Sequence, residues 1–410
     1  MPPSENLLIN TKNRMLILSN DYLSNVEKNS KVSEGGTGNF SELFSDYLLA
    51  KEHSWAGIII DGDKMAKRIF TRKIISSSGK LFYKLLIPSA IFNSVGVGNH
   101  TLEKAFEKVI DEMVIVMKKI NPDAVFLNGC YYKPWIILKA AKRLDIPVVT
   151  QHAGIMAMEA KTAYERGLTN KKKEQQLIKM EADFSKYSNI EIFLNEFSKK
   201  RYEQTTIKVD KNKAIIVPLP FFTIPFRKKN RAKKDGLKIG LVARWDGIKR
   251  HEDYLALVKM AKQQKENWDF YAITSIPDTN KNIEFKNEYR KLIKVLSPRS
   301  KRKLYDFYRQ MDLMVLTSRF DVSPTVVLEA AYLGVPTAIS PNVGFVEDYK
   351  KNKLDYLVCD FSNPAKAHLK IKKILDKKPP VAFFKHLMKQ HDPNLILAQY
   401  LEIFKKVTQK

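Results

Sequence analysis

The chain has 410 residues, 44% of them hydrophobic, and its lysines and arginines exceed its aspartates and glutamates by 27. This length predicts two domains, and the apolar fraction is that of a globular protein rather than a disordered chain. No window reaches the roughly 20 apolar residues of a membrane-spanning helix. The two cysteines, Cys130 and Cys359, are far apart, lack a metal-ligand spacing and predict no disulfide framework.

The positive charge predicts an anionic partner, such as nucleic acid, an anionic membrane or a phosphorylated ligand. A lysine-rich, solvated surface without a dedicated partner is an equal alternative. The N-terminus lacks the basic and then apolar pattern of a signal peptide, so we expect a cytoplasmic protein.

The first expected strand, Arg14–Ser19, is followed by a glycine-rich stretch that includes Gly35 and Gly36 and leads into a helical pattern. Glycines between a strand and a helix let the backbone approach an anion closely. The stretch lacks the complete dinucleotide-binding fingerprint, so a plain flexible connection is the alternative.

The next expected strand, Ala56–Ile60, ends in Asp61 and Asp63. Two such carboxylates could hold a divalent cation, but nothing nearby completes the site, and a polar turn is the favoured interpretation. Residues 64–95 then interleave basic and bulky apolar side chains. This pattern predicts a segment lying on an anionic membrane or, alternatively, an amphipathic helix packed on the sheet.

His152 follows the apolar run of a later strand and is therefore expected at its carboxyl end, where open α/β sheets bind ligands. A purely structural histidine is an equal alternative. Further along, residues 223–236 combine a proline with a cluster of positive charges and predict a linker.

A second series of strands and helices opens with the strand Leu237–Ala243, which runs directly into Arg244 and Lys249 ahead of a helix. A guanidinium offers a planar fork of donors, an ammonium a point charge, and a helix N-terminus free N–H groups. Together they are suited to binding a diphosphate.

Strand, loop, helix and strand follow one another between Leu313 and Ser340, which predicts a βαβ unit. Asp321 on its loop and Glu329 on its helix are eight positions apart, at the edge where such sheets bind ligands. Because strands and helices alternate throughout, we expect the α/β class with two doubly wound, Rossmann-like domains.

Taken together, Arg244-x4-Lys249 and Asp321-x7-Glu329 resemble the motifs of the retaining GT-B glycosyltransferases of the E-x7-E family, the glycosyl transferases group 1. The resemblance covers most of residues 237–350. The first half resembles the family more loosely, through the glycine loop and the strand end at His152.

The resemblance implies a GT-B fold whose two domains face a central cleft. The implied units are an acceptor-binding domain at 1–222, a linker at 223–236, a nucleotide-sugar-binding domain at 237–390 and a C-terminal helix at 391–410 that crosses back to the first domain.

The resemblance also implies roles for single residues. Arg244 and Lys249 would stabilise the leaving nucleoside diphosphate in place of a metal ion. Glu329 would bind the ribose and Asp321 the sugar, while His152 would contact the sugar from across the cleft. The donor would also meet the backbone at Gly35, Gly36, Ser323, Pro324, Thr325 and Val326.

We therefore expect a retaining, metal-independent hexosyltransferase without a cofactor, using a nucleotide-diphosphate sugar, with UDP favoured over GDP. Its acceptor would be a glycan or a lipid-linked glycan in bacterial cell-surface polysaccharide synthesis, with residues 64–95 on the inner membrane face and no nucleic-acid partner. The alternatives are a basic nucleic-acid- or membrane-binding protein and a GT-B protein that binds a sugar nucleotide without transferring the sugar.

The sequence departs from the family pattern at two places. Asp321 stands where the family usually has Glu, and Thr274–Asp278 replaces the usual glycine-rich turn. The first departure bears on the contact with the sugar, and the second leaves recognition of the base open.

Overall fold

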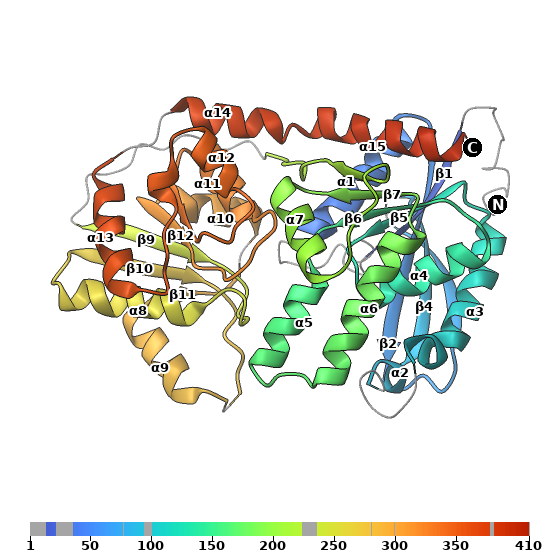
Figure 1. Cartoon of the computed structure of the whole chain (residues 1–410), viewed down its shortest axis with the longest axis horizontal. Helices are drawn as coiled ribbons and strands as arrows, with labels where there is room; N and C mark the ends of the chain where they lie inside the picture. Colours follow the sequence, from blue (N-terminus) through green and yellow to red (C-terminus); the bar gives the residue numbers. More distant parts are fainter. Residues whose placement is uncertain are drawn as a thin grey trace.

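The computed structural model describes residues 14–21, 36–76, 78–93, 101–223, 236–279, 281–298, 300–377 and 381–409. Within them the chain forms two separate sheets, each flanked by helices (Figure 1). The predicted α/β class with two doubly wound sheets is therefore confirmed. The predicted glycine contact at Gly35 lies outside the described residues, while Gly36 begins the first helix.

The N-terminal sheet has the strand order β3-β4-β2-β1-β5-β6-β7-β8, and all neighbouring pairs are parallel except β3 with β4. Its strands are β1 (Leu16–Asn20), β2 (Ser54–Asp63), β3 (Phe70–Ile75), β4 (Leu81–Pro88), β5 (Ala124–Asn128), β6 (Val148–His152), β7 (Ile190–Phe193) and β8 (Ala214–Ile216). Its helices are α1 (Gly36–Ala50), α2 (Ser89–Asn93), α3 (Leu102–Ile120), α4 (Tyr132–Arg143), α5 (Met156–Glu165), α6 (Lys171–Tyr187) and α7 (Glu196–Thr205).

The central strands of this sheet are buried along their whole length because helices cover both faces. Every residue of β5, β6 and β7 is buried. The helix α3 shows the complementary pattern, with one buried stripe, Thr101 as its N-cap and Asn121 in the left-handed conformation at its end. Packing between these strands and the helices on both faces thus fixes the positions of the strand ends.

For residues 64–95 the alternative of an amphipathic helix packed on the sheet is wrong within the described residues, while contact with a membrane stays a prediction. These residues form the antiparallel strands β3 and β4 and the short helix α2, and no long amphipathic helix. The apolar side chains of β4, such as Leu85 and Ile87, are buried in the sheet, which is why the segment is rich in them. No helix within the described part of the chain is long and apolar enough to cross a bilayer.

The C-terminal sheet is entirely parallel and has the order β11-β10-β9-β12-β13. Its strands are β9 (Leu237–Val242), β10 (Trp268–Ile273), β11 (Lys294–Leu296), β12 (Leu313–Leu316) and β13 (Thr337–Ile339). Its helices are α8 (His251–Gln263), α9 (Ile283–Leu292), α10 (Lys301–Tyr308), α11 (Thr325–Tyr332), α12 (Val346–Lys351), α13 (Pro364–Leu375) and α14 (Val381–Gln390), and a 3-10 turn spans Asp355–Leu357.

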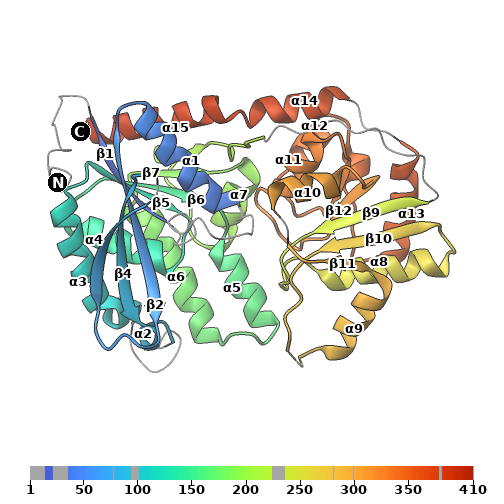
Figure 2. The ribbon, with the colours of Figure 1, turned by 180° about the vertical axis from the view of Figure 1, so that it is seen from behind.

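The last helix, α15 (Pro393–Thr408), leaves the C-terminal sheet and packs on the N-terminal one (Figure 2). Its Tyr400 and Phe404 contact the rings of Phe44 on α1 and Phe126 on β5. Tyr400 also hydrogen-bonds to Gln151 on β6. These contacts bury apolar surface between segments far apart in the sequence and tie the two halves of the molecule together.

Candidate active site

The loops that follow β9 and β12 bring two of the predicted site residues into direct contact. Lys249 Nζ lies 2.5 Å from Asp321 Oδ2, and the two side chains are only 16% and 15% exposed. The loops are held together by Thr317 Oγ1, which donates to the Lys249 carbonyl at 2.7 Å, and by the Arg319 N–H, which donates to the Ile248 carbonyl. Since β9 and β12 are neighbours, both loops emerge at the same edge of the sheet.

Arg244 lies on the same loop as Lys249, but its side chain is 79% exposed. Its only ion pair with the described residues is a 3.4 Å contact to Asp246. Asp246 also accepts from the N–H groups of Ile248 and Lys249, which fixes the turn between the two cations. The loop therefore presents one exposed guanidinium and one partly buried ammonium, in a conformation set by its own hydrogen bonds.

Glu329 is separated from this pair and lies inside α11, where it is 8% exposed. Tyr308 of α10 donates to its Oε2 at 2.7 Å. Burial raises the pKa of Glu329, and the Tyr308 hydrogen bond and the positive charge of Lys301 lower it in part. The structure thus gives Glu329 a hydrogen-bond partner that its sequence motif did not indicate.

The stretch Ser323–Val326 forms the entry to α11, which begins at Thr325 after Pro324. The first N–H groups of a helix have no partner within the helix and carry partial positive charge. This helix start follows Asp321 directly in the sequence, so the same loop supplies a carboxylate and an anion-binding helix end.

The predicted contact between His152 and a sugar is wrong for this structure. His152 is completely buried: its Nε2 lies 2.9 Å from Glu191 Oε1 and its Nδ1 lies 3.2 Å from Cys130 Sγ. Its ring stacks on Phe193 and meets Tyr202 edge-on. Both ring nitrogens have partners inside the N-terminal domain, so the side chain has no free atom to offer a ligand.

A carboxylate that the sequence analysis missed lies near the two cations. Glu159 on α5 is exposed to solvent, yet surrounding protein raises its pKa by desolvation, and Arg244 and Lys249 of the other domain lower it in part. Glu159 belongs to no sequence motif and lies 85 positions from Arg244. Only the packing of α5 against the C-terminal domain reveals it.

Direct contacts hold the two domains in this arrangement. Asn195 donates to the Val322 carbonyl at 2.7 Å, and Arg201 donates to Asn342 at 2.9 Å. At the end of α5, Glu165 pairs with Arg319 at 2.6 Å, and Arg166 donates to the Gly247 carbonyl at 2.8 Å. The loops that carry Lys249 and Asp321 are therefore bounded on one side by helices of the N-terminal domain.

Asp61 and Asp63, the alternative cation ligands, have partners close by. Asp61 pairs with Lys84 at 3.4 Å, and Asp63 accepts from the Met65 N–H at 2.7 Å. The first contact joins β2 to β4, and the second belongs to the turn that follows β2.

Comparison with known proteins places these residues in a family context. Residues 223–390 match the family model described as glycosyl transferases group 1. No curated protein matches the chain significantly.

Solved structures resemble the chain over nearly its whole length. A sucrose-phosphate synthase from Thermosynechococcus elongatus has a TM-score of 0.70 at 14% identity and covers 96% of this chain and 99% of its own. A UDP-forming trehalose-phosphate synthase from Burkholderia xenovorans has a TM-score of 0.65 at 12% identity, with the same coverage. A trehalose-6-phosphate structure from E. coli bound with UDP-2-fluoro glucose has a TM-score of 0.64 at 10% identity, again with the same coverage. At these identities the likeness concerns the fold.

Proposed function

The chain belongs, through residues 223–390, to the glycosyl transferases group 1 and has the GT-B fold, and from this premise we propose that it is a retaining, metal-independent glycosyltransferase. It moves a sugar from a nucleotide-diphosphate sugar to a glycan or lipid-linked acceptor in bacterial cell-surface polysaccharide synthesis. The observation that carries the proposal is the contact between Lys249 and Asp321 beside the exposed Arg244.

The two cations stabilise the leaving group. In transfer, the bond from the anomeric carbon to the diphosphate oxygen breaks and negative charge develops on that oxygen, while the acceptor hydroxyl oxygen bonds to the anomeric carbon and its proton passes to the leaving diphosphate. In this proposal Arg244 and Lys249 donate to the diphosphate once the donor is bound, where they stabilise the developing charge electrostatically. Arg244 is exposed before the donor arrives and can turn towards the diphosphate without breaking a strong contact.

Asp321 has two successive partners in this proposal. Without a donor, its carboxylate neutralises Lys249 at 2.5 Å. When the diphosphate takes over Lys249, Asp321 becomes available to accept a hydrogen bond from a sugar hydroxyl. A shorter side chain than the Glu of related proteins suits this exchange because Asp321 already lies within reach of Lys249.

Glu329 and the start of α11 complete the donor site. Tyr308 occupies one oxygen of Glu329, which leaves the other to accept from the ribose hydroxyls. The N–H groups at Thr325 and Val326 bind a phosphate oxygen at the helix N-terminus. We favour a UDP-sugar, and the fold shared with a UDP-forming synthase supports this choice.

On the acceptor side, we propose that Glu159 binds an acceptor hydroxyl. Glu159 is an exposed carboxylate of the N-terminal domain, and its pKa responds to both Arg244 and Lys249, the two cations that form the diphosphate clamp of this proposal. In a Glu159→Gln variant, the KM for the acceptor should rise about tenfold while donor binding is retained. The exposed Glu107→Gln on α3, far from the contacts between the domains, serves as the control for general charge effects.

We also propose that the strand pair β3–β4 touches an anionic membrane. Met65 is 87% and Ile75 is 65% exposed. The exposed basic residues beside them are Lys64, Lys67, Arg68, Arg72 and Lys73. Apolar side chains among basic ones bind anionic bilayers through insertion and charge together. In a flotation assay, the wild type should float with phosphatidylglycerol vesicles and a Met65→Asp/Ile75→Asp variant should not. Equal flotation of both proteins would reject this contact.

The central experiment is a thermal-shift screen against nucleotide-diphosphate sugars, followed by a transfer assay with excess chelator. A donor that binds the folded state raises the melting temperature by mass action. We expect one UDP-sugar to stabilise the protein and its sugar to be transferred with retention of anomeric configuration. Strict dependence on a divalent cation, or binding without any transfer, would contradict the proposal.

A further inference from the structure

A second concave surface lies on the C-terminal domain, at the opposite edge of its sheet from the clamp. It is a cavity of about 540 Å³ lined by the amino-terminal parts of β10 and β11 and by the last turns of α8 and α9. The clamp loops, by contrast, follow the carboxyl ends of β9 and β12. The cavity is therefore separate from the donor site and has no part in the transfer proposed above.

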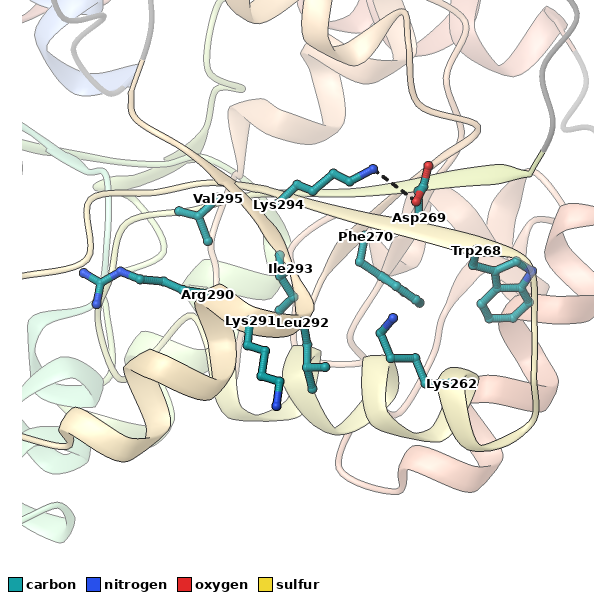
Figure 3. A pocket seen from close by; sticks show the side chains of 10 residues that line it. All are labelled: Lys262, Trp268, Asp269, Phe270, Arg290, Lys291, Leu292, Ile293, Lys294 and Val295. Carbon is teal, nitrogen blue, oxygen red and sulfur yellow. Dashed lines mark hydrogen bonds and ion pairs between the residues drawn. The ribbon is translucent and has the colours of Figure 1, made fainter.

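The walls of the cavity carry an excess of positive charge. Four cations line it, Lys262, Arg290, Lys291 and Lys294, against the single carboxylate of Asp269. Lys294 pairs with Asp269 at 3.3 Å (Figure 3). The side chains of the other three cations have no ion pair or hydrogen bond within the part of the chain that the structure describes. The lining thus retains three uncompensated positive charges.

The middle of the cavity is apolar. Figure 3 shows the side chains of Phe270, Leu292 and Ile293 between Lys262 on one side and Lys291 and Arg290 on the other. The indole of Trp268, which is 9% exposed, lies at one end. An apolar floor with a cationic rim suits a ligand that has a compact organic part and an anionic group.

Cations in the last turn of a helix also have a common structural role, because they offset the negative end of the helix dipole. Helix α3 provides the comparison. It ends with the exposed adjacent pair Lys118 and Lys119, just as α9 ends with Arg290 and Lys291. The α3 pair does not line this cavity. What sets the α9 pair apart is the concave apolar surface and the third unpaired cation, Lys262, on a neighbouring helix.

We propose that this cavity binds a phosphorylated ligand, with the phosphate held by Arg290 and Lys291 and the organic part against the apolar floor at Leu292, towards Lys262 and Trp268. Arg290 can bind two phosphate oxygens through its guanidinium, and the lysines add point charges. The inference goes beyond the proposed transferase activity, since binding at this site can be measured in a protein that transfers no sugar.

The test uses the full-length protein with Arg244→Ala and Lys249→Ala, which removes the diphosphate clamp of the donor site. Pyrophosphate is titrated by calorimetry at physiological ionic strength into this background. The same titration is repeated after adding Arg290→Ala/Lys291→Ala or the matched control Lys118→Ala/Lys119→Ala. Circular dichroism confirms that all three proteins fold.

We expect pyrophosphate to bind the background protein. The α9 substitutions should lower its affinity at least about tenfold, and the α3 substitutions less than about twofold. No binding to the background, or equal weakening by both pairs, would overturn the proposal. A second arm uses phosphatidylglycerol vesicles in place of pyrophosphate. Vesicle binding that depends on Arg290 and Lys291 would assign the phosphate to a lipid headgroup, whereas pyrophosphate binding alone would assign it to a soluble ligand.

Discussion

The Lys249–Asp321 pair of the C-terminal domain and the His152–Glu191 pair of the N-terminal domain both belong to the strand-end regions of parallel sheets. The first pair is about 15% exposed and stands beside the side chain of Arg244, which is 79% exposed. The second pair has no exposed surface, and a cysteine and two aromatic rings surround it. Position in the fold is therefore not enough to make a polar pair functional.

The two pairs differ in the secondary structure to which their residues belong. Lys249 and Asp321 lie on loops beyond the strands, where the chain turns towards the other domain. His152 is the last residue of β6 and Glu191 lies within β7, so both side chains enter the layer between sheet and helices. Glu191 Oε1 accepts from Ser185 Oγ as well as contacting His152, and these buried contacts favour one arrangement of the side chains. The first pair can exchange partners with a ligand, and the second cannot without unpacking.

The largest expected effect concerns the exposed pair. Replacing both Arg244 and Lys249 by alanine should lower kcat/KM for sugar transfer by roughly 100- to 1,000-fold, because leaving-group stabilisation is lost. The melting temperature should change little, since Arg244 is exposed and Asp321 can be rehydrated. Lys118→Ala/Lys119→Ala removes the same charge elsewhere and should retain activity. Near-normal transfer by a folded clamp variant would remove these residues from the mechanism.

A substitution in the buried His152–Glu191 pair should lower stability, whereas the substitutions at Arg244 and Lys249 lower activity. His152→Ala leaves the Glu191 carboxylate and the Cys130 thiol without their common partner, and should lower the free energy of unfolding by about 3 kcal/mol. Urea titration measures this loss, and the exposed His386→Ala is the control. Unchanged stability combined with a higher KM for the donor would show instead that His152 reaches the sugar.

Glu329 offers a pH-dependent test of burial within the donor site. Its pKa is raised in the folded protein, so the folded state holds this proton more tightly than the unfolded state. Its contribution to stability is therefore greatest below the ordinary pKa of Glu and is lost as the pH rises through the folded pKa.

Gln can still accept from Tyr308, so Glu329→Gln removes the charge and keeps that hydrogen bond. We expect the variant to be more stable than the wild type at pH 7, with the difference shrinking towards pH 4. Melting temperatures from pH 4 to 8 measure it, with the exposed Glu347→Gln as the control. If the difference in stability grew towards low pH, the pKa of Glu329 would be lowered in the folded protein and not raised. The same variant should bind the donor more weakly.

The smallest effect is expected at the rim between the domains. Arg319→Ala removes an ion pair with Glu165 whose partners are 43% and 37% exposed, so the loss of stability should stay below about 1 kcal/mol. Small-angle scattering of the donor-free protein would show whether this contact limits domain opening. An increase in the radius of gyration is the expected result, and an unchanged value would confine the contact to a local role.

The sequence predicted the site more fully in one domain than in the other, for a physical reason. Lys249 and Asp321 come from motifs in which a strand, a turn and a helix start follow within a few residues, and local rules fix such units. The burial of His152 depends on Cys130, Glu191 and Tyr202, which lie 22, 39 and 50 positions away along the chain. Placement at a strand end could not reveal which layer its ring would enter.

By itself, the sequence determined that this is an α/β protein with two doubly wound sheets, and it singled out Lys249 and Asp321, which the structure brings into contact. The tertiary structure alone decided that Tyr308 donates to Glu329, that Glu159 lies near Arg244 and Lys249, and that β3 and β4 form an antiparallel pair. Hydrophobic periodicity and turn-forming residues act over a few neighbouring positions, so they can be recognised in the sequence. Contacts between distant elements are selected by the packing of the whole molecule, which no local pattern encodes.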